Sequence, residues 1–324
     1  MSSNNEIIEN ISNILSNILK QSSFSDIDCE NDIFLPKYIS KNYIHKKILV
    51  LSGGGIKGIS FLGSLHALYE LNILQNIQTF SGTSVGSLIL FLYIIGYLPN
   101  DMYELVKIID LSKVKKIDVQ LFLNDFGLNS GDKLITILHK LLNSKKISSK
   151  ITFLELYEKT KKTFIVTSVN INEQKLEYFS YTSHPNMEVI QAIRMSISIP
   201  FVFTPVLYNN CLYVDGGCID NFPISYFSEN IENVIGICVT ESNTNKTKIE
   251  TLYDYAINVI CSILNGISTS VIKSYEKYII NIMLDSISFI DFDISNDNKI
   301  KLFNIGYKKT HEYFEHTKNT KNNL

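Results

Sequence analysis

A chain of 324 residues is long enough to bury a full hydrophobic core, which excludes a small scaffold held together by disulfide bonds. Apolar residues make up 45% of the sequence and charged residues 19%, values typical of a folded globular protein and not of a disordered one. The formal net charge of −2 provides no overall attraction to nucleic acid, so no nucleic-acid partner is expected.

The cysteines and the apolar runs indicate the cellular compartment. The five cysteines form no C-x-x-C pair and have no histidines at zinc-binding spacing, which indicates a reducing compartment and no metal site. The first residues, Met-Ser-Ser-Asn-Asn-Glu, lack the positive charge and apolar segment of a secretory signal. The longest apolar run, residues 88–98, is too short to span a bilayer. We therefore expect a cytoplasmic protein without a signal peptide or a transmembrane helix.

Residues 1–45 are predicted to form a helical extension that precedes the main fold. Apolar side chains recur there at helical spacing within a sequence rich in Asn and Ser. Such a helix can dock on the core or lie in a membrane interface. Its polar face carries mainly Asn, Ser and Glu instead of Lys and Arg, which favours docking. The apolar residues concerned are Ile7, Ile8, Ile11, Ile14, Leu15, Ile18 and Leu19.

From Lys46 onward, strand and helix patterns alternate, which predicts an α/β fold with a mostly parallel central sheet flanked by helices. Residues 46–226 are expected to form the core of the fold, and residues 227–324 the remainder of the same α/β domain with a polar helical tail. Strands are predicted at 48–51, 77–81, 164–169, 175–179, 212–214, 234–239 and 279–283, and helices at 59–74 and 85–97.

The first glycine turn follows the first predicted strand and opens a helix. Its backbone N–H groups can converge on a negative charge at the positive end of that helix. The turn matches G-x-G-x-x-G, but the next strand ends in Thr79-Phe80-Ser81-Gly82 and offers no acidic residue to bind a ribose, and the P-loop spacing is absent. The residues of the turn are Gly53, Gly54, Gly55, Ile56, Lys57 and Gly58.

The second glycine turn, Gly82-Thr83-Ser84-Val85-Gly86, is a G-x-S-x-G sequence between a predicted strand and a predicted helix. In that context the motif forms a sharp turn that exposes the serine hydroxyl as a nucleophile. A glycine-rich helix start is the alternative. Because a serine hydroxyl is a weak nucleophile until a neighbouring group accepts its proton, the sequence must also supply a base.

Two kinds of base are available. His311 and His316 follow Ser84 and Asp215 in the Ser, Asp, His order of α/β-hydrolases, but both lie in a lysine-rich tail typical of a solvated helix. Asp215 ends a predicted apolar strand and precedes Gly216 and Gly217, where a carboxylate can face a neighbouring loop. An ordinary Asp-Gly turn is the alternative for Asp215.

Taken together, these blocks resemble the signature blocks of the patatin-like phospholipase family in order and spacing. The segments Gly53–Gly58, Gly82–Gly86 and Asp215–Gly217 carry the resemblance. The run Ala192–Pro200, and Asn221 with Pro223 after the aspartate, also look like the family. The resemblance covers roughly residues 46–226.

The resemblance implies a patatin-like three-layer architecture and a lipid acyl hydrolase of the phospholipase A or lysophospholipase type, with no metal and no cofactor. Ser84 would attack the ester and Asp215 would accept its proton, without a histidine. Backbone N–H groups of Gly53, Gly54, Gly55 and Ile56 would form the oxyanion hole. The supporting motif residues would be Lys57, Gly58, Gly82, Gly86, Gly216 and Gly217.

Several neighbouring residues have interpretations of their own. A cation at a helix N-terminus is disfavoured by the dipole, so Lys57 is either an exposed lysine or faces an anion such as a lipid phosphate. Arg194 and Pro200 are interpreted as placing the helix and turn behind the site, and Cys218 as a small buried residue. Residues 113–123 join a basic cluster to apolar residues and form either a packed loop or a peripheral membrane contact.

Two further hypotheses remain open at this point. One is a histidine-dependent esterase of the α/β-hydrolase type. The other is a catalytically silent protein that binds a lipid or another anion through its glycine turns. The expected partner in the main hypothesis is a phospholipid or another acyl ester, while the head group and any activating protein are not specified by the sequence.

Overall fold

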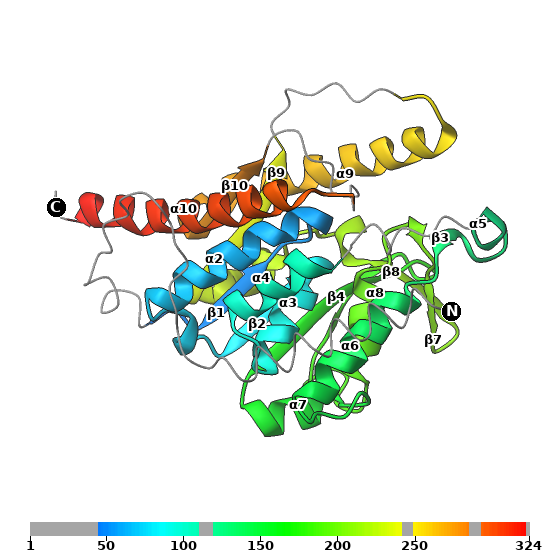
Figure 1. Cartoon of the computed structure of the whole chain (residues 1–324), viewed down its shortest axis with the longest axis horizontal. Coiled ribbons are helices and arrows are strands. Elements are labelled where there is room, and N and C mark those ends of the chain that lie inside the picture. The colour runs from blue at the N-terminus through cyan, green and yellow to red at the C-terminus, as the bar shows by residue number, and fades with distance from the viewer. Residues whose placement is uncertain (1–44, 110–118, 242–248, 285–292, 322–324) are drawn as a thin grey trace.

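The computed structural model describes residues 45–109, 119–241, 249–284 and 293–321. The predicted N-terminal helix lies outside the described residues, as do residues 113–118 of the segment considered for membrane contact. Helices flank a central sheet that is largely parallel (Figure 1), so the predicted α/β class is confirmed.

The central sheet has eight strands, in the order β10-β9-β1-β2-β4-β8-β7, with β5 paired separately to β4. The strands from β10 to β4 are parallel, and β5, β7 and β8 are antiparallel to their neighbours. A second sheet pairs β3 with β6. The strands are β1 (Ile48–Leu51), β2 (Thr79–Thr83), β3 (Gly127–Asn129), β4 (Thr163–Asn170), β5 (Lys175–Phe179), β6 (Phe201–Phe203), β7 (Val206–Tyr208), β8 (Cys211–Asp215), β9 (Val234–Glu241) and β10 (Ile279–Leu284).

Helices cover both faces of this sheet, because its parallel strands carry apolar side chains on both sides. Leu49 and Leu51 of β1 belong to a large core that includes α2, α3, α4, α6 and α10, while Val50 packs with α9 and the segment Pro223–Asn233 on the opposite face. The helices are α2 (Ile59–Glu70), α3 (Val85–Ile94), α4 (Pro99–Ile108), α5 (Val119–Asp125), α6 (Asp132–Ser144), α7 (Phe153–Thr160), α8 (Val189–Ser196), α9 (Leu252–Tyr275) and α10 (Asn296–Lys321). Shorter 3-10 helices are Gly55–Gly58, Leu74–Asn76, Gly216–Cys218, Pro223–Asn233 and Glu276–Tyr278.

The predicted polar tail is helix α10, which runs along α2 (Figure 1). Its polar sequence predicted a solvated helix, but one face is buried. Leu302, Phe303 and Phe314 pack into the main core, and His311 is buried beside Glu70 of α2. The helix is therefore an integral part of the fold.

One edge of β4 pairs with two strands placed end to end. Strand β2 pairs in parallel with the first part of β4 and ends with Thr83 opposite Thr167. Strand β8 pairs in the antiparallel direction with the last part and ends with Asp215 opposite Ser168. Because β5 overlaps both parts, it lies on the other edge of β4. Strands β2 and β8 therefore run toward each other, and Ser84, directly after β2, meets Asp215.

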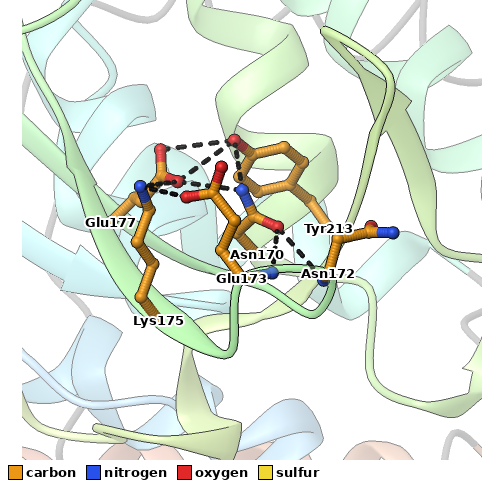
Figure 2. Close-up of polar contacts among 6 residues, drawn as sticks. All are labelled: Asn170, Asn172, Glu173, Lys175, Glu177 and Tyr213. Carbon is orange, nitrogen blue, oxygen red and sulfur yellow. Dashed lines mark hydrogen bonds and ion pairs between the residues drawn. The ribbon is translucent and has the colours of Figure 1, made fainter.

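A polar cluster at the β4–β5 turn supports this register (Figure 2). The Tyr213 hydroxyl of β8 donates to the Glu177 carboxylate, with 3.2 Å to Oε1, and Asn170 Nδ2 donates to that carboxylate at 3.2 Å. Asn170 Oδ1 accepts the N–H groups of Asn172 and Glu173 at 3.2 and 3.1 Å, which closes the turn. Since Tyr213 precedes Asp215 on β8, the cluster holds the strand that carries the candidate base.

Candidate active site

The strand, sharp turn and helix predicted around Ser84 are present. Ser84 lies between β2 and α3 with φ 52° and ψ −127°, a conformation that costs roughly 1–3 kcal/mol for a residue with a side chain. Close packing makes a glycine necessary two residues later, because a Cβ atom on Gly86 would lie 2.5 Å from the carbonyl oxygen of Ser52. The turn is therefore held tightly against the end of β1.

Two buried serines fix the backbone of the turn. The Ser84 N–H donates to Oγ of Ser196 at 2.9 Å, and Oγ of Ser87 donates to the Ser84 carbonyl oxygen at 2.7 Å. Ser196 is fully buried at the end of α8. Ser196 belongs to the segment Ala192–Pro200, which resembles the family, but the sequence did not predict its hydrogen bond with the Ser84 N–H. The available signal was a serine between the apolar residues Met195 and Ile197.

Asp215 ends β8 and is buried, with only 5% of its surface exposed. Its carboxylate accepts the Gly217 N–H at 2.8 Å and lines the same cavity as Ser84. Burial raises the pKa of Asp215 to about 7, although the hydrogen bonds from Ser84 and Gly217 act in the opposite direction. A pKa near neutrality suits a group that must accept and return a proton.

The first glycine turn faces this pair, but its N–H groups are not equivalent. The Gly53 N–H donates to the carbonyl oxygen of Asn221 at 2.9 Å, so it is not available for an oxyanion hole, which corrects the prediction for this residue. Gly54 and Gly55 line a cavity with Ser84 and Asp215. Among the described residues, neither of their N–H groups has a hydrogen-bond acceptor. Gly55 has φ 54°, a left-handed conformation that favours glycine.

The other predicted members of the turn lie deeper. Ile56 is buried and contributes to the apolar core, and its side chain lines an apolar cavity behind the turn. Lys57 is also buried, which excludes the exposed lysine considered from the sequence, and its ammonium group forms an ion pair with Glu241 at the end of β9. The anion expected near Lys57 is therefore a carboxylate of the protein itself. Gly58 packs against Val85, where its lack of a side chain lets the two glycine turns approach.

Arg194 fastens the segments behind the site, as the sequence predicted. Its guanidinium donates to the carbonyl oxygen of Ser130 at 2.7 Å and to that of Thr204 at 3.0 Å, and it also contacts Oγ of Ser198. Burial lowers the pKa of Arg194 to about 10, which leaves the group charged at neutral pH. The clamp joins α8, which carries Ser196, to the loops before α6 and after β6.

Arg194→Ala is expected to lower the free energy of unfolding by about 3 kcal/mol, because two carbonyl oxygens lose charged donors in a partly buried position. Urea unfolding followed by circular dichroism measures this. Arg194→Lys is the matched control and should restore only part of the loss, since lysine lacks the planar fork of donors. A loss below about 1 kcal/mol for the alanine variant would contradict the clamp.

Two cavities meet at Ser84. One, of about 70 Å³, is lined by the glycine turn, Ser84, Asp215, Asn221 and Glu241. The other, of about 190 Å³, is almost entirely apolar and lies between α2, α3, α4 and α6. A chemical group at Ser84 thus has polar surroundings on one side and a hydrocarbon-like space on the other.

The described histidines do not reach this site. His311 lies at the α2–α10 interface, with Nε2 3.8 Å from the Glu70 carboxylate, and no described histidine lines either cavity at Ser84. The side chain of His316 lies outside the described residues. Cys218 lines the smaller cavity, where burial raises the pKa of its thiol to about 12, so the thiol stays protonated at neutral pH.

A profile described as patatin-like phospholipase matches residues 49–228, more than half of the chain and all three glycine-containing blocks. The chain belongs to the patatin-like phospholipase family. The family is a class of hydrolases, and its assignment confirms the resemblance drawn from the sequence blocks.

Relatives within and beyond viruses share the patatin-like region. The probable lipid hydrolase 463L of Invertebrate iridescent virus 6 is 40% identical over 184 residues, which cover 55% of this chain and 62% of that protein. Lysophospholipase NTE1 of Scheffersomyces stipitis is 29% identical over 186 residues, 55% of this chain and 10% of that protein. The crystal structure of VipD from Legionella pneumophila shares the fold with a TM-score of 0.58 and 17% identity, covering 84% of this chain and 67% of VipD.

Within the described part of the patatin-like chain, no helix has the length and apolar character needed to cross a bilayer.

Proposed function

We propose that this patatin-like protein is a lipid acyl hydrolase in which Ser84 is the nucleophile and Asp215 the base. One observation supports the proposal: Ser84, in its strained turn, and the buried Asp215 carboxylate line the same cavity where a polar and an apolar cavity meet, and Ser84 is close enough to lower the pKa of that carboxylate. A nucleophile with a base close by is the arrangement that activates a serine.

In the proposed reaction, the Ser84 oxygen attacks the ester carbonyl carbon while Asp215 takes the hydroxyl proton. The negative charge that develops on the carbonyl oxygen is stabilised by the N–H groups of Gly54 and Gly55, aided by the N-terminal end of α3. The carbon–oxygen bond to the leaving alcohol then breaks, and Asp215 returns the proton to that alcohol. Water attacks the resulting acyl-enzyme with Asp215 again as base, and the fatty acid leaves with Ser84 restored.

The apolar cavity supports an acyl chain as the part of the substrate that binds next to Ser84. It is lined by side chains of Leu88 and Leu92 on α3 and Met102 on α4, among other aliphatic groups. Each methylene placed there is worth about 0.8 kcal/mol. The polar cavity would hold the alcohol portion of the ester beside Asn221 and Glu241. The names of the relatives, a lysophospholipase and a probable lipid hydrolase, support the same substrate class.

Release of fatty acid from phospholipid and lysophospholipid vesicles tests the proposal. The wild-type chain is expected to release fatty acid in the presence of a chelator, and Ser84→Ala to lower the rate at least about 10⁴-fold. A fluorophosphonate probe should label the wild-type chain and not Ser84→Ala. Ser228→Ala is the matched control and should keep its labelling, because Ser228 is exposed and lines neither cavity.

Two other outcomes of the labelling and hydrolysis assays would lead to different conclusions. Labelling of Ser84 without hydrolysis would support a competent site whose substrate or activator is missing from the assay. Absence of both labelling and hydrolysis in a folded protein would favour the binding protein that uses its glycine turns without catalysis, and would overturn the proposed function.

A further inference from the structure

Helix α9 carries an apolar stripe on its exposed side. Tyr255, Val259 and Ile263 follow one another at intervals of four residues, so they lie on one face of the helix. Tyr255 and Ile263 are 57% and 54% exposed. None of residues 255–272 is charged. Exposed apolar side chains gathered on one face of a helix mark a contact surface and not an ordinary solvated surface.

A second apolar group, the α5 patch, consists of Leu123, Phe126 and Phe201. Leu123 at the end of α5 is 72% exposed, and Phe126 is also exposed. Phe201 joins them because β3, directly after Phe126, pairs with β6, placing Gly127 opposite Phe201. The start of α9 and helix α5 lie at the same right-hand end of the molecule in Figure 1.

Each apolar group is next in the chain to a residue that lines the cavity at Ser84. Ile260 lies on α9 between two stripe residues and lines that cavity. Pro200 also lines it and directly precedes Phe201 of the α5 patch. Exposed apolar side chains of two separate segments therefore lie close in the chain to the lining of the cavity.

We propose that the α9 stripe and the α5 patch together dock the protein on a lipid surface, so that an ester passes from the lipid layer into the cavity without entering water. The inference rests on the proposed function, because that function supplies a substrate held in lipid layers. Helices with an apolar face bind such layers by burying that face at the boundary between head groups and acyl chains. Because residues 255–272 offer no Lys or Arg, the α9 stripe favours zwitterionic lipid, and its contribution to binding should depend little on salt.

Flotation with phosphatidylcholine vesicles tests the docking surface without turnover, using the full chain with Ser84→Ala. The protein should float with the vesicles at both 0.1 and 0.5 M salt, conditions that differ strongly in screening. Adding Leu123→Asp and Ile263→Asp should lower the partition coefficient at least tenfold. Leu98→Asp is the matched control and should change nothing, because Leu98 is also exposed but lies beyond the end of α3 that is remote from Ser84.

The results of these assays distinguish a lipid-docking surface from a dimer interface. The proposed docking surface would be overturned if the double variant bound vesicles as strongly as its parent. It would also be overturned if the parent, Ser84→Ala, did not float with the vesicles. A dimer of the parent that dissociates in the double variant would overturn it in favour of a second copy of the chain. In the active background, a soluble short-chain ester should be hydrolysed equally with and without the two substitutions while vesicle hydrolysis falls at least tenfold. If no chain with Ser84 intact hydrolyses the soluble ester, the result counts against the proposed function. The flotation assay then tests the docking surface independently.

Discussion

Asp215→Asn is expected to lower the rate of ester hydrolysis about 10³-fold, because it removes the proposed acceptor of the Ser84 proton while keeping the shape of the side chain. In the wild-type chain, the rate should fall as the pH is lowered through about 7, since protonated Asp215 cannot act as a base. Initial rates on a soluble acyl ester between pH 5 and 9 measure both effects. Activity of Asp215→Asn within tenfold of wild type would exclude Asp215 as the base.

The same substitution is expected to stabilise the folded chain at alkaline pH. The pKa of Asp215 is about 7 in the folded state, against about 3.9 for an unfolded aspartate. Between these values the folded state retains a proton that the unfolded state has released, so the free energy of unfolding falls as pH rises through this window. The full cost, present above pH 7, is on the order of 4 kcal/mol, and asparagine avoids it because it does not ionise.

Urea unfolding at pH 4.5 and pH 8 measures this linkage. Asp215→Asn should gain stability over wild type at pH 8 and little at pH 4.5. Asp125→Asn, at an exposed aspartate of α5, is the matched control and should leave the difference between the two pH values unchanged. Equal effects of Asp215→Asn at both pH values would contradict the raised pKa. A buried carboxylate that lowers stability in this way is a candidate for a functional role.

Substitutions in the apolar cavity are expected to change the acyl-chain preference in a graded way. Leu88 and Leu92 line the cavity on α3, and Leu92 lies about 12 Å along the helix from Ser84. Leu88→Trp blocks the cavity near Ser84 and should lower the ratio of hydrolysis of sixteen-carbon to six-carbon esters about 100-fold, which corresponds to the loss of roughly four bound methylenes. Leu92→Trp blocks only the far part and should lower the ratio about tenfold.

Competition between short and long esters in one reaction measures the ratio directly. Phe91→Trp is the matched control, since Phe91 lies on the same helix and in the same core but does not line the cavity. All three variants enlarge a packed side chain and are expected to lose about 1–3 kcal/mol of stability, so thermal unfolding must accompany the assay. An unchanged chain preference in folded Leu88→Trp would show that the acyl chain binds elsewhere.

The sequence by itself determined the local parts of the site. The turns at Gly53–Gly58 and Gly82–Gly86 form within a few residues, because glycines permit the left-handed and closely packed backbone that each turn requires. The alternating apolar segments predicted the principal strands, and the structure confirms those at 48–51 and 175–179 with the same bounds. The short strands β3, β6 and β7 were missed, since three residues are too few to show an alternating pattern.

Only the tertiary structure decided how these local parts meet. The pairing of β8 against the last part of β4 brings Asp215 to Ser84, and no local pattern specifies that antiparallel register. The partner of Lys57 is Glu241, which is 184 residues away, and the Gly53 N–H is taken by the Asn221 carbonyl. Local turns form because a few residues have the backbone freedom that the turn requires. The contacts named here form only when strands that are distant in the sequence pair in the sheet. That pairing depends on how the whole chain buries its apolar side chains.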